Sequence, residues 1–156
     1  MKVGIIGAGS VGSTTAFALI MRGVARKVVL VDQNKKKAEA EAMDIAHATP
    51  FAYASKIKAG DYADLNGCEV VIVTAGANQK PGQSRTDLLA VNVKIFEDII
   101  PQVVAHAPDC ILLIASNPVD IMTAVALKLS GFPKERVFGS GTTLDTARFR
   151  TLLGYH

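Results

Sequence analysis

Short hydrophobic runs alternate along this chain with longer segments rich in helix-forming residues. A run such as VVIV at 70–73 shows no polar alternation, which is typical of a parallel strand covered on both faces. Strands that alternate with helices predict a parallel sheet with right-handed crossovers, here an α/β fold with a doubly wound six-stranded sheet and helices on both faces. We expect strands at 3–7, 27–32, 57–61, 70–76, 110–116 and 136–141, and helices over 9–23, 35–48, 85–108, 117–131 and 142–154.

Glycine and proline mark the expected ends of several helices. Gly23 stands at a C-terminal cap position of the first helix, and Pro50 ends the second because proline cannot continue a helix. Pro101 lies inside the long third segment and predicts a kink or a break there. We expect Asn117 to cap the fourth helix, with Pro118 as its first residue.

Length and charge limit the possible functions. The 156 residues suffice for one domain with a substantial core. Basic and acidic residues number 17 and 14, so the net charge is +3, and the run KKK at 35–37 alone does not predict nucleic-acid binding. The mean hydropathy of +0.29 is high for a soluble monomer, and indicates either a fully covered sheet or apolar surface that faces another domain or subunit.

The cysteines and the N-terminal residues indicate a reduced, cytoplasmic protein. Cys68 and Cys110 each open an apolar run without metal-ligand or disulfide spacing, so we interpret both as core thiols and expect no metal. Glycine, serine and threonine interrupt the first apolar stretch, unlike a signal peptide. No run reaches the ~20 apolar residues of a membrane-spanning helix, so we expect no membrane association.

The segment GAGSVG at 7–12 is a G-x-G-x-x-G motif between the first expected strand and helix. In this setting Gly7 permits a tight turn, Gly9 lets a pyrophosphate approach the backbone, and Gly12 allows the helix and strand to pack closely. The free N–H groups at the start of the helix attract phosphates. By itself the hexapeptide is a weak signal for dinucleotide binding.

Asp32 strengthens this interpretation because it lies 20 residues after Gly12, at the end of the second strand. A carboxylate there accepts hydrogen bonds from ribose hydroxyls and repels a 2′-phosphate, which favours NAD over NADP. Two alternatives stay open. Asp32 could only cap a turn, or the protein could be a methyltransferase that uses the same acid for the ribose of a nucleoside.

Six segments, GAGSVGS, VLVD, GDYADL, TAGANQKPGQSR, ASNPVD and GSGTTLDTARFR, run over nearly the whole chain. Together they resemble the lactate and malate dehydrogenase family, and more closely the bacterial NAD-dependent L-lactate dehydrogenases. The resemblance implies a Rossmann-type dinucleotide-binding domain over 1–156, NAD as cofactor, and hydride transfer between NADH and pyruvate in the intact enzyme.

By this resemblance, NQKPGQSR at 78–85 is a mobile active-site loop that closes over the substrate. Arg85 would polarise the substrate carbonyl, and closure would strengthen this interaction by expelling water. Gln79 would select the substrate, because a neutral amide tolerates the methyl group of pyruvate, whereas malate enzymes have an arginine there for the second carboxylate of oxaloacetate. Pyruvate and lactate are therefore the expected substrates. Without the resemblance, both residues would be ordinary polar loop residues.

The resemblance also assigns residues after the fifth and sixth strands. Asn117 would contact the substrate or the nicotinamide, and its bond to Pro118 is expected to be cis. Arg148 would bind the substrate carboxylate and Asp145 would orient the catalytic histidine, although their spacing alone predicts an ordinary i,i+3 ion pair. Arg150 matches an effector-phosphate position, or is simply an exposed helix arginine. Further residues that match cofactor-lining positions are Val11, Lys37, Tyr62, Gly76 and Ala77.

The family's proton donor is a histidine in a G-E-H-G-D motif, which these 156 residues do not contain. His47 and His106 fall on helices away from the strand ends and His156 is the last residue, so we expect surface or interface histidines. General acid catalysis contributes roughly 10²- to 10⁴-fold to such a reaction. We therefore expect the NAD-binding half of a lactate dehydrogenase, without its catalytic domain, that is inactive or nearly so by itself.

Two other functions stay open: a stand-alone NAD-binding or self-associating module, and a malate-type enzyme with an atypical loop. In full-length relatives the helix that contains MDIAHATPF, here 43–51, packs against another subunit, generally in tetramers. We therefore expect a homo-oligomer, with a dimer through this face as one form and nonspecific association through uncovered surface as the alternative.

Overall fold

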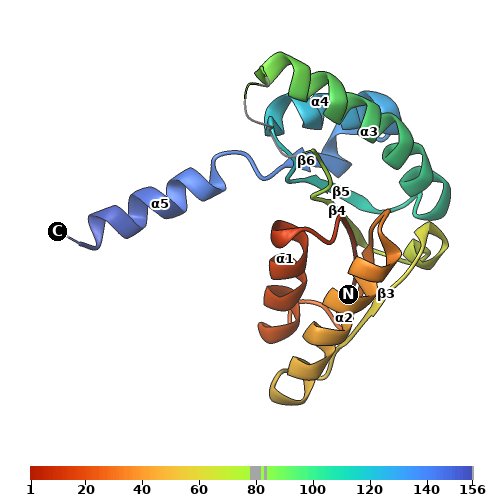
Figure 1. Ribbon diagram of the computed structural model, residues 1–156, viewed down its shortest axis with the longest axis vertical. Helices are drawn as coiled ribbons and strands as arrows, with labels where there is room; N and C mark the ends of the chain where they lie inside the picture. The colour runs from red at the N-terminus through yellow and green to blue at the C-terminus, as the bar shows by residue number, and fades with distance from the viewer. Residues whose placement is uncertain (78–81, 83, 156) are drawn as a thin grey trace.

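Figure 1 shows a computed structural model of the chain, which describes residues 1–77, 82 and 84–155. Within these residues, six strands form one sheet in the order β3-β2-β1-β4-β5-β6, and all five neighbouring pairs are parallel. The predicted fold class is therefore confirmed. The strands are β1 (Lys2–Ile6), β2 (Lys27–Val31), β3 (Lys56–Ala59), β4 (Val70–Val73), β5 (Ile111–Ile114) and β6 (Val137–Gly139).

The chain changes direction across the sheet between β3 and β4. It adds β2 and β3 on one side of β1 and then returns to place β4 on the other side, so that Gly4 pairs with Val29 and with Val71. Connections that leave β1 and β4 in opposite directions open a crevice at the carboxyl ends of these strands, which is where ligands bind in such sheets.

Two apolar cores cover the two faces of the sheet. The helices are α1 (Ser10–Met21), α2 (Lys35–Ala48), α3 (Arg85–His106), α4 (Val119–Ser130) and α5 (Thr143–Leu153), with single 3-10 turns η1 (Thr49–Phe51), η2 (Tyr62–Leu65) and η3 (Lys134–Arg136). Ile20 of α1 and Ile45 of α2 belong to one core, and Phe96 of α3 and Met122 of α4 belong to the other. Figure 1 shows α1 and α2 on one side of the sheet and α3 and α4 on the other. Each fully buried side chain of this size contributes about 1.5–3 kcal/mol to folding.

The helix ends differ from the predictions at two points. Gly23 adopts φ 66° just after α1, and α2 ends at Ala48 before Pro50, both as predicted. Pro101 lies inside α3, which continues as one helix to His106, so the possible break is not found. The prediction that Asn117 caps α4 is wrong: Pro118 is the N-cap, because its backbone is extended (φ −73°, ψ 121°) and the helix starts after it.

Helix α5 forms where it was predicted but covers neither face of the sheet. None of its residues, all of which the structure describes, is buried, and Figure 1 shows the helix extending away from the other elements.

Cys68 and Cys110 are buried free thiols, as predicted, and burial raises the pKa of both. Among the helices in the described part of the chain, none is long and apolar enough to cross a membrane.

Candidate nucleotide-binding site

The three glycines of the G-x-G-x-x-G segment meet three different steric requirements. Gly7 has φ 107°, and a Cβ there would lie 2.8 Å from the backbone nitrogen of Ala75. A Cβ at Gly12 would lie only 1.8 Å from the carbonyl oxygen of Gly7, so only glycine lets α1 pack this closely on the end of β1. A Cβ at Gly9 would meet no atom within 4 Å. The space in front of Gly9 is therefore open for a ligand to approach the backbone.

The start of α1 offers hydrogen-bond donors to an anion in that space. Gly9 is the N-cap residue and has no side chain that could accept a bond from the first turn, where Val11 is 59% exposed. The first intrahelical bond joins Ser13 N–H to the Gly9 carbonyl at 2.9 Å, which leaves the preceding N–H groups without helical partners. These groups and the helix dipole together favour a phosphate.

Asp32 directly follows β2 and lies at the mouth of this loop. Its Oδ2 accepts the backbone N–H of Ala8 at 2.7 Å, and its Oδ1 accepts the N–H of Asn34 at 2.8 Å. The second bond is the turn-capping role considered above, and it coexists with the first. A carboxylate has about four lone-pair positions, so Asp32 can still accept bonds from ribose hydroxyls. The residues present therefore fit the adenosine and pyrophosphate of a dinucleotide.

Two of the predicted cofactor-lining residues lie on elements that contact β2, the strand before Asp32. Tyr62 opens η2 and is half-buried, and its pKa is raised by this burial and by the negative charges of Asp98 and Asp32. Lys37 lies in the first turn of α2, where its backbone N–H donates to the Asn34 side chain at 3.2 Å and its side chain is exposed. The charge of Asp32 thus acts on the Tyr62 hydroxyl, whereas the Lys37 side chain lies on the surface.

Three polar side chains that the sequence analysis did not single out connect the carboxyl ends of β1, β4 and β5. The hydroxyl of Thr74 lies 3.0 Å from the Gly7 carbonyl. That of Ser116 donates to the Ala75 carbonyl at 2.6 Å. Asn92 is buried and bonds to the segments after β4 and β5. The sequence contained one indication of this role for Asn92. It is a polar residue four positions before the core residue Phe96 in α3, so it lies on the face of the helix that packs on the sheet.

The remaining predicted residues of the crevice lie at its β4 and β5 side. Gly76 is exposed and Ala77 half-buried just after β4, and Asn117 is exposed just after β5. The Asn117–Pro118 bond is cis, as the resemblance implied. Gln79 lies outside the described residues, and of Arg85 the structure describes only the backbone, as the first residue of α3.

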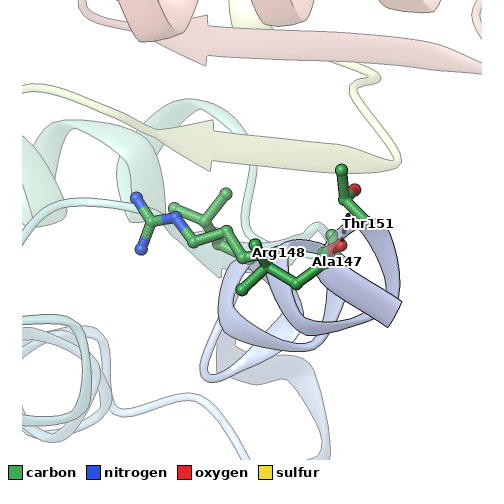
Figure 2. A pocket seen from close by; sticks show the side chains of 5 residues that line it. Ala147, Arg148 and Thr151 are labelled. Carbon is green, nitrogen blue, oxygen red and sulfur yellow. Dashed lines mark hydrogen bonds between the residues drawn. The ribbon is translucent and has the colours of Figure 1, made fainter. Parts of the chain in front are cut away.

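The structure does not bring the predicted residues of α5 to the crevice. Asp145 and Arg148 form the i,i+3 ion pair at 3.1 Å, with side chains 68% and 66% exposed, and Arg150 is exposed on the same helix. The hollow of about 480 Å³ in Figure 2 lies along α5 and is lined mainly by apolar groups of this helix. A mainly apolar face of one helix does not suit a phosphate, so we place the nucleotide site at the glycine loop instead.

The two histidines that the structure describes lie where the sequence predicted. His47 is exposed on α2, and His106 ends α3 with its Nδ1 atom 2.8 Å from the Gln102 carbonyl oxygen. His156 is outside the described residues. Neither described histidine lies at a strand end, where a substrate would bind.

A doubly wound parallel sheet with a glycine loop after its first strand and an aspartate after its second defines a dinucleotide-binding domain. The model of the lactate/malate dehydrogenase NAD binding domain family matches residues 1–139. The chain therefore belongs to this family, its cofactor is NAD, and the methyltransferase alternative no longer applies.

Known relatives agree with this assignment. The chain is 58% identical over 156 residues to an L-lactate dehydrogenase of Thermus aquaticus and 56% identical to one of Geotalea daltonii, and it spans 50% of each. The crystal structure of the minor L-lactate dehydrogenase of Enterococcus mundtii aligns with this chain at a TM-score of 0.95 and 44% identity. The alignment covers 99% of this chain and 49% of the Enterococcus chain. Malate dehydrogenase of Archaeoglobus fulgidus, solved with NADH, matches at a TM-score of 0.93 and 41% identity, with 53% of its own chain covered. The chain thus spans about half the length of the relatives it matches.

Proposed function

We propose that this chain is the NAD-binding part of an L-lactate dehydrogenase, an enzyme that transfers a hydride between NADH and pyruvate. The observation that carries the proposal is the carboxylate of Asp32, held 2.7 Å from the backbone nitrogen of Ala8 at the open glycine loop. When bound, the cofactor supplies or accepts the hydride. The residues of the chain hold the adenosine and the pyrophosphate so that the other end of the dinucleotide extends toward β4 and β5.

The substrate-side residues are proposed from the family resemblance. Gln79 would accommodate the methyl group of pyruvate, Arg85 would polarise its carbonyl, and Asn117 would contact it from the end of β5. Arg148 would bind the carboxylate, and Asp145 would orient a histidine donor. In this structure both side chains are exposed on α5, which extends away from the other elements. Arg150 would bind an effector phosphate.

We also propose that residues 1–156 form one dinucleotide-binding domain that binds NADH but by itself reduces pyruvate slowly or not at all. The support is chemical, because these residues contain no G-E-H-G-D histidine, and a proton must reach the alkoxide that forms from the carbonyl. Pyruvate reduction, followed by NADH absorbance with and without a supplied C-terminal half of a relative, tests this. Activity of the 156 residues alone near that of intact relatives would refute it, and faster reduction of oxaloacetate than of pyruvate would favour the malate-type alternative.

The Asp32→Asn variant tests the cofactor site. Asparagine keeps the size of the side chain but removes the charge, and a hydrogen bond to a charged group contributes about 1.5–3 kcal/mol. NADH affinity should therefore fall at least about tenfold, and the preference for NADH over NADPH should shrink. Asp109→Asn, at an exposed position before β5, is the matched control and should bind NADH like the wild type. Unchanged affinity and cofactor preference in Asp32→Asn would contradict the proposed site.

A homo-oligomer in the cytoplasm is the proposed state of the protein. Apolar side chains at the end of α2 and in the turn after it support self-association, since Met43, Phe51 and Tyr53 are 60%, 85% and 68% exposed. The buried free thiols support a reducing compartment. Light scattering with and without NAD tests the association, and Phe51→Lys should shift the protein toward the monomer if this face is used.

A further inference from the structure

Asn92 is a buried amide that joins two segments at the carboxyl edge of the sheet. Among the described residues, the buried polar side chains are Asn92, Ser116 and Ser130, and Asn92 is only 2% exposed. Its Oδ1 accepts the backbone N–H of Ala77 at 2.8 Å, and its Nδ2 donates to the carbonyl of Asn117 at 2.9 Å. One side chain of α3 therefore connects the segment that follows β4 with the segment that follows β5.

The two segments lie at a defined half of the proposed cofactor site. A doubly wound sheet consists of two mononucleotide-binding halves, and a dinucleotide lies across the crevice between them. The glycine loop after β1 and Asp32 after β2 occupy the half that holds the adenosine. Ala77 and Asn117 follow β4 and β5 in the other half, where the fold places the nicotinamide nucleotide.

We propose that Asn92 is a positioning residue that holds the walls of the nicotinamide half at their proper separation. This inference rests on the proposed function. Asn92 fits the task because it is buried and because it bonds to one segment through its oxygen, at Ala77, and to the other through its nitrogen, at Asn117. Gly76 adds to the contact, since a Cβ there would lie 3.4 Å from Asn92 Oδ1. Both bonds go to backbone atoms, so the role that we assign to Asn92 is exerted through these neighbours.

The two bonds can be removed in different ways. Asn92→Leu keeps a similar volume and loses both bonds, so Ala77 N–H and Asn117 C=O must find other partners. Asn92→Asp keeps an acceptor for Ala77 but turns a carboxylate oxygen toward the Asn117 carbonyl, which then has no donor. In both variants Asn92 no longer connects Ala77 with Asn117, while the bond from Ser116 to the Ala75 carbonyl, the glycine loop and Asp32 are unchanged.

The test compares a ligand that fills both halves with one that fills only the adenosine half. NADH and ADP-ribose are titrated by calorimetry into the wild type, Asn92→Leu, Asn92→Asp and the control Ser130→Ala. Ser130 is also buried and hydrogen-bonded, but it ends α4 at the opposite edge of the sheet. We expect NADH to bind about tenfold more weakly to both Asn92 variants, as the loss of about one hydrogen bond predicts. ADP-ribose should bind to these variants within about twofold of its affinity for the wild type. The Ser130→Ala control should bind both ligands like the wild type.

Each outcome has a defined meaning. A parallel loss of NADH and ADP-ribose affinity would show that Asn92 only stabilises the fold, and unchanged NADH affinity would show that the bridge does not matter; either result overturns the inference and leaves the proposed function intact. If Asn92→Leu does not fold, Asn92→Asp, which retains the bond from Ala77, decides the question. If the wild type binds ADP-ribose and NADH equally tightly, the inference fails, and if it binds neither, the proposed function fails as well.

Discussion

Replacing Gly9 by alanine should weaken NADH binding without unfolding the protein, whereas the same change at Gly12 should damage the fold itself. The difference follows from the space around each residue. A methyl group at Gly9 points into open space, and the backbone there (φ −77°, ψ −178°) suits any residue. A methyl group at Gly12 would lie 1.8 Å from a backbone oxygen, although contacts of a Cβ below 3.0 Å are essentially never seen.

The expected magnitudes separate the two variants clearly. For Gly9→Ala, reduced entropy of the unfolded chain stabilises by about 0.4–1 kcal/mol, and alanine is a poorer N-cap than glycine by a similar amount. Its stability should therefore stay within about 1 kcal/mol of the wild type. The methyl group would push a pyrophosphate away from the N–H groups of α1, and each bond to a charged group is worth about 1.5–3 kcal/mol, so NADH affinity should fall at least about tenfold.

For Gly12→Ala, α1 must move by more than 1 Å to bring the contact from 1.8 to 3.0 Å, and overpacking of this kind costs about 1–3 kcal/mol or more. Thermal unfolding and calorimetric titration with NADH measure both quantities. A shift of 1 kcal/mol corresponds to about 2–4 °C in Tm for a chain of this size. The reasoning is refuted if Gly9→Ala binds NADH like the wild type, or if Gly12→Ala keeps both its Tm and its affinity.

Two further predictions concern the thiols and α5. Burial raises the pKa of Cys110 to about 11 from an ordinary value of 9.0. The folded state therefore holds the thiol proton more tightly than the unfolded state does. The free energy of unfolding should thus be constant below about pH 9 and decline between about pH 9 and 11. Urea titrations across this pH range measure the decline in stability, which should be smaller in Cys110→Ala. In a separate experiment, a thiol reagent at neutral pH should label Cys68 and Cys110 only after unfolding. Asp145→Ala should change the free energy of unfolding by less than about 1 kcal/mol, because its ion pair with Arg148 is largely exposed; a larger loss of Tm would mean that α5 makes contacts that this structure lacks.

Most of the fold could be predicted because its causes are local. Uninterrupted apolar runs indicate buried parallel strands, and glycines with special backbone or steric requirements mark the loop after β1. The six strands and five helices are found where the pattern predicted, with shifts of a few residues at their ends. Prediction was less accurate where two local preferences compete, as at Asn117 and Pro118, where both residues favour a helix start and the structure uses Pro118 as the cap.

The contacts between distant segments could not be predicted in the same way. The bridge of Asn92 spans 15 residues to Ala77 and 25 to Asn117, and Thr74 bonds to Gly7 across 67 residues. Such pairs depend on the register of β1, β4 and β5 and on the rotation of α3 over the sheet, which no short segment encodes. The same holds for α5, whose sequence predicts a helix but not what it packs against. The pattern of residues thus determined which elements form and which loop can approach a phosphate, whereas the packing of the elements decided which polar groups meet at the crevice.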